Sequence, residues 1–372
     1  MRELSQFDLP HEAWHRLRAR NPVCWSPRRK AWLLTRYRDV AALFRDPRLA
    51  VLKPSVGRPA GAPSDPAARR ALQHRTGAYD ELLRKRLVPS TVAALEPFVR
   101  REVRRLLEAG VEDWMDALAL PLPFLVMAEL LGLDPVPDPA PLRALFDDVT
   151  AGVDMDVSPR AAARRDLALV TLARHLEPRL GSRGLGAELA ARGQERRVLM
   201  HYVVMLLYAG TTTTKGLLGN ALVGLARHPE LWRELAGNPG RIPEAVEEFL
   251  RWDGPVQGVG RVALEEIPVG DAVLRPGDGV YLMTGAANRD PEVFPDPDRL
   301  CLGRPGPHLA FAVGSTYCLG AGLARLEARV VLEEFLARHP EPRGLAALEW
   351  APHRLVREPR RLELENPLGR SR

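Results

Sequence analysis

The chain has 372 residues, of which 46% are apolar, and a formal net charge of +6. This composition provides enough apolar side chains for a large buried core and excludes a disordered or fibrous chain. Arginine and glutamate are interspersed, and no dense basic run lies beside aromatic residues, so nucleic-acid binding is not expected.

The cysteine content and the hydropathy pattern indicate a cytoplasmic protein. Cys24, Cys301 and Cys318 are widely spaced and offer neither a disulfide framework nor the CxxC spacing of a zinc site. They favour a reducing compartment, in which a thiolate is available as a ligand. The first ten residues lack the apolar core of a signal peptide. The longest apolar stretch, 198–209, is too short to span a bilayer, so no membrane association is expected.

The predicted elements follow the order of one mostly helical domain. The opening third mixes helix and strand signals, and it ends in a Pro- and Gly-rich segment, 51–67, that predicts a loop. A loop of this length inside a compact domain is more often functional than a simple connection. The pattern from 80 to 250 is mainly helical, that of 267–283 favours strands and turns, and 318–338 returns to helix. With neither repeats nor a clear linker, we expect one α+β domain, mostly α with a small β region, over residues 1–372.

The segment from Phe311 to Arg325 places a cysteine between glycines at the start of a strong helical pattern. Gly314 and Gly320 permit positive φ values and the close approach of a bulky group. Cys318 stands at the helix N-terminus, where the helix dipole and free backbone N–H groups stabilise a thiolate. The residues of this loop alone leave two readings open, a metal-binding thiolate and an ordinary buried cysteine.

Two further patterns lie upstream of the cysteine. Glu248 and Arg251 share one face of a predicted helix and can pair, either within a functional network or on the surface. Another predicted helix, 205–220, contains Ala209 and Gly210 followed by four threonines, which are poor helix formers. Their position in mid-helix indicates a function, with simple packing as the alternative.

Taken together and in this order, these motifs resemble those of the soluble bacterial cytochromes P450. The cysteine loop resembles the haem-thiolate signature, the Glu–Arg pair resembles the ExxR motif, and the threonine run resembles the AGxxT segment. The segment 288–299 resembles the family's meander, and the likeness extends from about residue 31 to the end of the chain. The resemblance implies the P450 fold and haem b. The implied haem contacts are the iron ligand Cys318 and the surrounding residues Arg261, Lys85, Phe311, Gly320, Ala209 and Gly210.

The resemblance also implies roles for residues around the haem. Thr213 corresponds to the threonine that hydrogen-bonds bound oxygen, next to Thr212, and a local bulge in this helix is expected to open a groove there. Arg299 is expected to complete a structural network with Glu248 and Arg251. The expected lining of the substrate pocket, besides the loop 51–67, is Met205, Leu206, Val256, Val259 and Leu355. These side chains are aliphatic, which favours a substrate with an apolar or aromatic face.

The sequence departs from the family pattern at several positions. Thr212 replaces the acidic residue that relays protons, and a second threonine with water offers a substitute because hydroxyls both donate and accept. Glu81 and Lys85 stand where the family has histidine and arginine, and Thr316 stands where histidine is common. We therefore expect haem retention to depend on Arg261 and Lys85.

The function implied by the resemblance is that of a haem-thiolate oxidoreductase. The leading hypothesis is a monooxygenase that hydroxylates or epoxidises a small organic molecule or peptide, typically in secondary metabolism. Electrons are expected from a separate ferredoxin-type donor, because no flavin or nicotinamide domain fits in the chain. Thr212 supports an alternative, an atypical P450 that catalyses oxidative coupling, nitration or desaturation. A non-enzymatic haem protein for sensing or storage is a third hypothesis.

Overall fold

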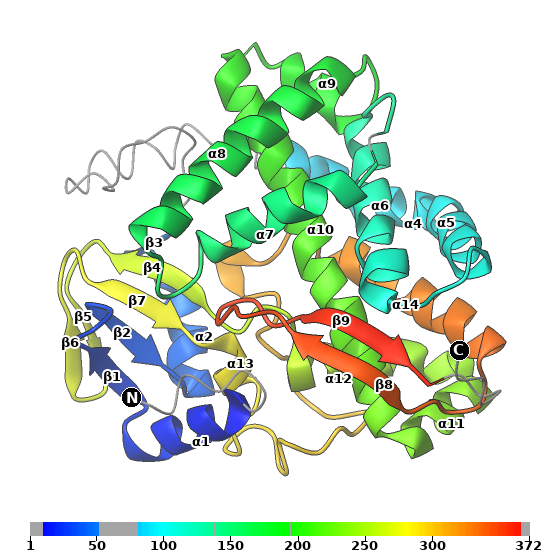
Figure 1. Cartoon of the computed structure of the whole chain (residues 1–372). Coiled ribbons are helices and arrows are strands. Elements are labelled where there is room, and N and C mark those ends of the chain that lie inside the picture. Colours follow the sequence, from blue (N-terminus) through cyan, green and yellow to red (C-terminus); the bar gives the residue numbers. More distant parts are fainter. Residues whose placement is uncertain (1–9, 52–80, 137, 194, 366–372) are drawn as a thin grey trace.

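The computed structural model describes residues 10–51, 81–136, 138–193 and 195–365 (Figure 1). The first half of the chain forms α1 (Pro10–Arg20), β1 (Val23–Ser26), β2 (Ala31–Leu34), α2 (Tyr37–Arg45), β3 (Leu49–Val51), α4 (Pro89–Ala94), α5 (Glu96–Glu108), a π-helical turn (Met115–Ala119), α6 (Pro121–Leu131), α7 (Arg143–Ala151), α8 (Pro159–Leu176) and α9 (Gly184–Ala190). The second half forms α10 (Arg196–Arg227), α11 (Pro229–Gly237), α12 (Ile242–Asp253), β4 (Val259–Ala263), β5 (Ile267–Val269), β6 (Ala272–Leu274), β7 (Gly279–Leu282), α13 (Thr284–Ala287), α14 (Ala321–Arg338), β8 (Leu345–Trp350) and β9 (Pro359–Leu364). The predicted class, mostly helical with a small β region, is confirmed.

The strands form one five-stranded sheet and two hairpins. The sheet has the order β1-β2-β7-β4-β3, with β2 and β7 parallel and the other pairs antiparallel. It joins three distant parts of the chain, so β4, which carries Arg261, lies between β7 and β3. β5 pairs with β6 and β8 pairs with β9. Apart from Val51 at the end of β3, the predicted loop 51–67 lies outside the described residues.

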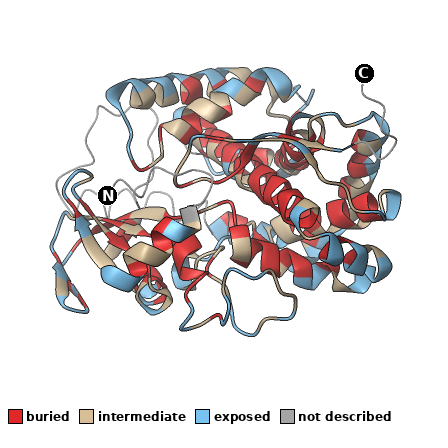
Figure 2. Cartoon of the chain, turned by 60° about the horizontal axis from the view of Figure 1, so that its bottom comes forward, coloured by how far each residue is buried: buried red, intermediate tan, exposed pale blue. Residues whose placement is uncertain are grey.

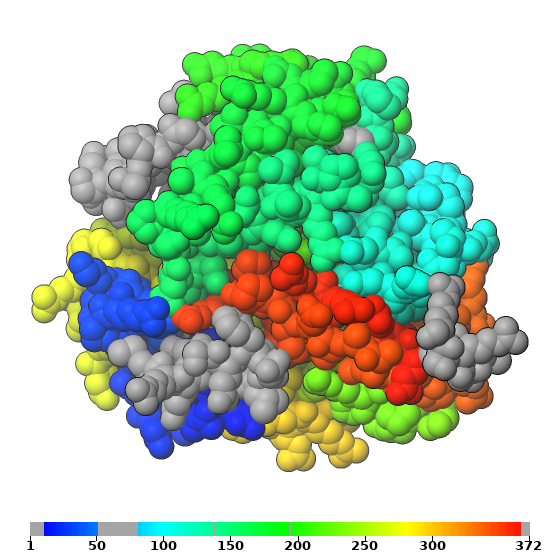
Figure 3. All heavy atoms as spheres, viewed as in Figure 1, coloured from blue at the N-terminus to red at the C-terminus, as the bar shows by residue number. Residues whose placement is uncertain are grey.

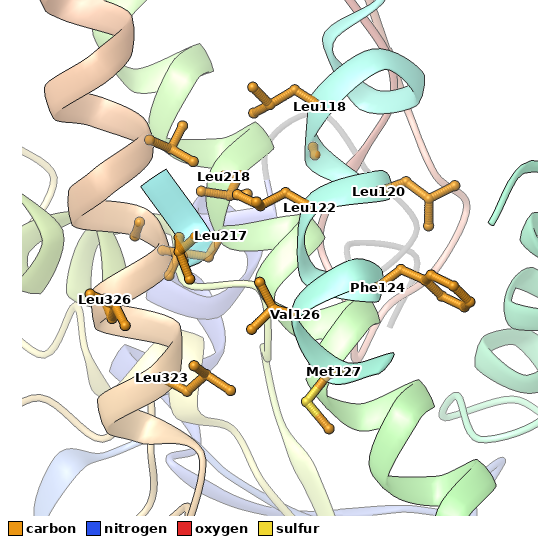
Figure 4. Packing of buried hydrophobic residues seen from close by; sticks show 14 of the residues in the cluster. Leu118, Leu120, Leu122, Phe124, Val126, Met127, Leu217, Leu218, Leu323 and Leu326 are labelled. Carbon is orange, nitrogen blue, oxygen red and sulfur yellow. The ribbon is translucent and has the colours of Figure 1, made fainter. Parts of the chain in front are cut away.

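The central element is α10, a 32-residue helix that runs through the middle of the helical region (Figure 1). Its residues are apolar or small on nearly every side, a pattern typical of a helix covered all around. Figure 2 shows its long buried stretch. Leu217 and Leu218 extend between Leu323 of α14 and Val126 of α6 (Figure 4). The oxygen-site segment expected from the sequence therefore lies on a well-fixed scaffold.

Two further clusters of buried apolar residues lie beside this helical core. One is formed by the sheet and α2, and a smaller one contains Trp14, Leu33, Met283 and Leu355. In the space-filling view, the hairpin β8–β9 (orange to red) fills the space between the helices and the sheet region (Figure 3). Within the described ranges, no helix is both long and apolar enough to cross a membrane.

Candidate haem site

The cysteine loop is held closed by its own backbone. The N–H of Cys318 donates to the carbonyl of Phe311 at 2.9 Å. Ala312 and Gly314 adopt positive φ values of 56° and 69°, a conformation in which glycine is strained least. Cys318 is exposed and lies three residues before the first residue of α14, Ala321. Neighbouring groups raise the pKa of its thiol by desolvation, while the N–H of Gly320 and the charge of Arg325 oppose that rise.

The buried carboxylate of Glu248 fixes the segment that leads to this loop. Arg251 donates to both of its oxygens at 2.7 Å. The prediction that Arg299 is the third member of this network is wrong. The side chain that reaches Glu248 is that of Arg304, whose Nε lies 3.1 Å from Oε1 of Glu248. Arg299 supplies only its backbone carbonyl, which accepts from Arg251 at 3.2 Å. The chain between α13 and α14 is thereby tied to α12 through buried charge pairs.

A second carboxylate, Glu247, ties α12 to α14 and was missed in the sequence. Arg325 donates to both of its oxygens, at 2.6 and 2.8 Å, and His308 lies 3.2 Å away. Burial opposes ionisation, but Arg325 and His308 outweigh it and lower the pKa of Glu247 to about 2. Arg325 also lies over the ring of Phe311, 4.6 Å from its centroid. The only sequence signal was that Glu247 adjoins Glu248.

Arg261 is a buried cation with no acidic partner in the described residues. It is 8% exposed, its Nη1 donates to the carbonyl of Gly260, and it lies 5.6 Å from the ring centroid of Phe44. Desolvation lowers the pKa of its guanidinium to about 10. A guanidinium in this setting suits an anionic group such as a haem propionate, because its fork donates two parallel hydrogen bonds to a carboxylate.

The structure places the predicted oxygen-site residues along one face of α10. Ala209 is exposed, and Gly210 and Thr213 are half-buried, whereas Thr211 and Thr212 on the adjoining face are buried. The expected bulge is absent, because α10 continues as an α-helix through this segment. The hydroxyl of Thr213 donates to the carbonyl of Ala209 at 2.8 Å, which satisfies it within the helix.

Gly210 has a packing role that the sequence did not suggest. A Cβ at this position would lie 2.5 Å from Sδ of Met127 on α6. A larger residue at this position would require the flexible side chain of Met127 to move. Its small size thus serves the contact between two helices, in addition to the implied passage over a haem.

The predicted pocket residues lie on α10, just before and in β4, and in the C-terminal turn. Met205 and Leu206 are half-buried on α10, close to Ala209 in the helix. Val256 lies beside the C-terminal turn, where it forms an antiparallel β-bridge with Val356. The backbone N–H of Gln257, which follows Val256, donates to the carbonyl of Leu355 at 2.8 Å. Val259 is half-buried at the start of β4. Their role as pocket lining stays a prediction.

Lys85 was expected to contact the haem, but its side chain is exposed and pairs with another residue. Its Nζ lies 2.6 Å from Oε1 of Glu81, the residue that replaces the family's histidine. Arg86 pairs with Glu188 of α9 at 2.7 Å. Thr316, at the other departure, donates to the carbonyl of Val313 within the cysteine loop. Arg261 is therefore the better supported of the two predicted propionate partners.

These residues fit a haem. Cys318 is exposed just before a helix, the buried guanidinium of Arg261 has no acidic partner among the described residues, and α10 carries Ala209 and Gly210 on a partly exposed face. Cys318 would hold the iron and Arg261 a propionate. A cysteine thiolate that binds the haem iron is the defining feature of haem-thiolate proteins, and the site of this chain fits that class.

Comparisons with known proteins give the family. Residues 242–339 match the family described as "Cytochrome P450". The chain is 30% identical to the biotin biosynthesis cytochrome P450 of Bacillus subtilis (92% of this chain, 91% of that protein). It is 33% identical to the erythromycin C-12 hydroxylase of Saccharopolyspora erythraea (87% and 85%). A structure of P450BioI bound to an acyl carrier protein that carries hexadec-9Z-enoic acid is similar, with a TM-score of 0.85, 28% identity and coverage of 98% and 99%.

The chain belongs to the cytochrome P450 family. It is a P450 monooxygenase, and membership implies the haem-thiolate cofactor that the sequence predicted.

Proposed function

We propose that this enzyme hydroxylates or epoxidises a small, largely apolar organic molecule in secondary metabolism, with Cys318 as the iron ligand. The proposal depends most on the exposed cysteine of a hydrogen-bonded loop, together with the buried guanidinium of Arg261, which has no acidic partner in the part of the chain that the structure describes. The 33% identity to an erythromycin hydroxylase supports the substrate class. When bound, a thiolate-ligated haem supplies oxidising chemistry, since the thiolate favours cleavage of the O–O bond.

The protein's own residues would bind and orient the substrate. Met205 and Leu206 on α10 and Leu355 in the C-terminal turn offer aliphatic contacts and no charge. Apolar walls exclude water and leave orientation to shape, which suits a hydrophobic substrate. Arg261 would hold a propionate, and its charge would be neutralised in the low-dielectric interior.

We further propose that a separate acidic ferredoxin-type protein donates electrons in the cytoplasm. A groove of about 610 Å³ beside Cys318 is lined by α4, α12 and α14, including Leu87, Leu319 and Arg325. The basic residues 84–86 lie immediately before Leu87. Attraction between opposite charges speeds association and is screened by salt. Reduction by an acidic ferredoxin should therefore slow as salt is added, and salt-independent reduction would contradict this docking face.

The first test is a spectral-shift titration of the haem against free small molecules, short peptides and carrier-bound amino acids. A shift with free terpenoid or aromatic compounds supports the proposed hydroxylase. In a separate test, Cys318→Ser should abolish the red-shifted band of the reduced carbon monoxide complex, and Cys301→Ser should retain it. An unchanged band in Cys318→Ser would show that the iron ligand is misassigned.

Oxidative coupling, nitration or desaturation is the second candidate function. Thr212 favours it, because no acid stands at that position to relay protons. A spectral shift only with peptides or carrier-bound ligands would favour it over hydroxylation. With a substrate in hand, the hydrogen peroxide released per NADPH consumed separates the two, since inefficient proton delivery diverts reduced oxygen to peroxide.

A further inference from the structure

A buried ion pair lies behind the threonine run of α10. Nζ of Lys215 is 2.9 Å from Oε1 of Glu358, and the two side chains are only 7% and 3% exposed. Lys215 lies in the middle of α10, and Glu358 immediately precedes β9. Burying two charges carries a desolvation penalty that their mutual attraction does not always recover. The pair therefore calls for a reason beyond stability.

The pair adjoins the oxygen-site threonines. Lys215 follows Thr211 by four residues and Thr212 by three, spacings that place side chains on neighbouring positions of one helix face. Gly216 follows Thr212 by four residues, and a Cβ there would lie 3.4 Å from Cβ of Glu358. Glu358 thus packs against the turn of α10 that follows these threonines.

Three oxygens in this neighbourhood lack hydrogen-bond partners in the described part of the chain. They are Oγ1 of Thr211, Oγ1 of Thr212 and Oε2 of Glu358, all of them buried. Buried polar atoms in proteins are almost always hydrogen-bonded, often to internal water. Grouped around one helical turn, these atoms mark a polar spot suited to hold water and to move a proton.

The other side of Glu358 leads toward the surface. Half-buried Asp147 of α7 and half-buried His353 act electrostatically on its carboxyl. Tyr208 is buried nearby, and its hydroxyl lies 3.0 Å from that of Thr150. Burial raises the pKa of Glu358 above its ordinary value, while Lys215 opposes the rise. The carboxyl therefore keeps a proton to higher pH than an exposed glutamate does.

We propose that Glu358, paired with Lys215, is a proton-relay residue that acts through Thr212, which lies on the buried face of α10 next to the haem-facing one. The Glu358 carboxyl gives its proton, through buried water, to the Thr212 hydroxyl oxygen as Thr212 passes its own proton to a second water that leads toward Thr213. Glu358 then regains a proton from solvent past Asp147 and His353. Only protons move, so no oxidant or reductant is needed. The inference rests on the proposed function and names what takes the place of the missing acid.

The experiment compares Glu358→Gln, which removes the acid, with Glu358→Asp, which keeps it. Glu363→Gln, a change at a half-buried glutamate of β9 that pairs with Arg361, is the matched control. On the full-length ferric protein, infrared difference spectra across a pH titration should show a protonated carboxyl band that Glu358→Gln abolishes. During turnover, Glu358→Gln should release several-fold more peroxide per NADPH, with a larger solvent isotope effect and an altered pH profile. Glu358→Asp should restore much of the coupling.

The outcomes separate this inference from the function on which it rests. A missing thiolate band in the reduced carbon monoxide complex of the wild type would overturn the proposed function, while the infrared titration still reports on Glu358. If that band is normal but Glu358→Gln matches Glu363→Gln in peroxide release, isotope effect and pH profile, the pair is only structural and the proposal fails. Lys215→Met serves as a second variant, expected to shift the Glu358 carboxyl band.

Discussion

Two regions around the site treat their buried polar atoms in opposite ways. On the cysteine side, formed by α12, the 288–318 segment and the start of α14, Glu248 accepts from Arg251, Arg304 and the N–H of Cys301. On the helix side, formed by the threonine run of α10 and the turn before β9, Thr212 and Glu358 keep oxygens without partners in the described residues. The Glu248 network on the cysteine side is fully hydrogen-bonded, whereas the oxygens of Thr212 and Glu358 on the helix side are not.

This difference corresponds to two tasks, the positioning of a ligand and the exchange of protons. A fully hydrogen-bonded network is rigid and fixes one geometry, which suits the positioning of an iron ligand. Polar atoms left free of fixed partners retain the capacity to bind water or pass a proton. The cysteine side thus positions the Cys318 thiolate, whereas the helix side has the properties of a proton path.

The largest expected effect is on the cysteine side. Glu248→Gln leaves Arg251 and Arg304 without their buried counter-ion, and breaking a buried pair in this way costs about 3–5 kcal/mol. Urea unfolding measures the loss. Glu188→Gln, which removes only a surface partner of Arg86, should cost no more than about 1 kcal/mol. Equal costs for the two variants would remove the contrast between a satisfied network and an ordinary surface.

Haem retention should depend more on the buried arginine than on the exposed lysine. Arg261→Ala removes charged hydrogen bonds to a propionate worth about 1.5–3 kcal/mol, which corresponds to roughly a tenfold or greater loss of haem affinity. Lys85→Ala should weaken haem binding less, since Lys85 already pairs with Glu81. Transfer of haem to an excess of haem-free acceptor protein measures both. Unchanged affinity in Arg261→Ala would contradict the assignment.

The close contact between α6 and α10 offers a test of the helix side. Gly210→Ala places a methyl group 2.5 Å from Sδ of Met127, at the flexible end of that side chain, so overpacking should cost no more than about 1 kcal/mol. Thermal unfolding should show the loss, and Met127→Ala in the same chain should relieve part of it. Gly237→Ala, where nothing lies within 4 Å, is the control. A neutral Gly210→Ala would mean that the Met127 side chain moves aside freely and that the contact between the helices does not need a glycine.

The smallest effect concerns pH and the junction between the two sides. His11 pairs with Asp253 at the end of α12, and burial, with Arg289, lowers the pKa of His11 from 6.5 to about 4. The unfolded chain takes up this proton at higher pH than the folded one, so stability should fall as pH drops from 6.5 to about 4. His11→Gln should flatten that slope by at most one proton, as read from unfolding curves at several pH values. The control, His15→Gln, should leave it intact.

Local patterns in the sequence were sufficient for the fold class and for the motif residues. The helix after Cys318, the pairing of Glu248 with Arg251 and the long helix around Thr213 all follow from short-range spacing. Family resemblance then supplied the cofactor. These features depend on residues close together in the chain, where periodicity is informative.

The remaining features depend on tertiary contacts that spacing does not encode. Arg299 and Arg304 lie five residues apart in an irregular segment, and only the path of that segment decides which side chain reaches Glu248. Lys215 and Glu358 meet because the C-terminal turn crosses α10. The predicted bulge in α10 is not found, and the hydroxyl of Thr213 instead donates to the carbonyl of Ala209 within the regular helix.

Asp253 has a consequence for protein engineering. Its carboxylate accepts from Arg357 at 2.9 and 3.0 Å and lies 3.2 Å from His11, so one residue fastens the first helix and the C-terminal turn to the end of α12. Arg357 is the immediate neighbour of Glu358. A truncated variant that begins after α1 would lose the contact between His11 and Asp253. Because Asp253 also binds Arg357, this loss would weaken the region beside the buried Lys215–Glu358 pair. Tags and fusions attached ahead of α1 should be tolerated, whereas shortening of α1 should disturb the packing around Asp253 and Glu358.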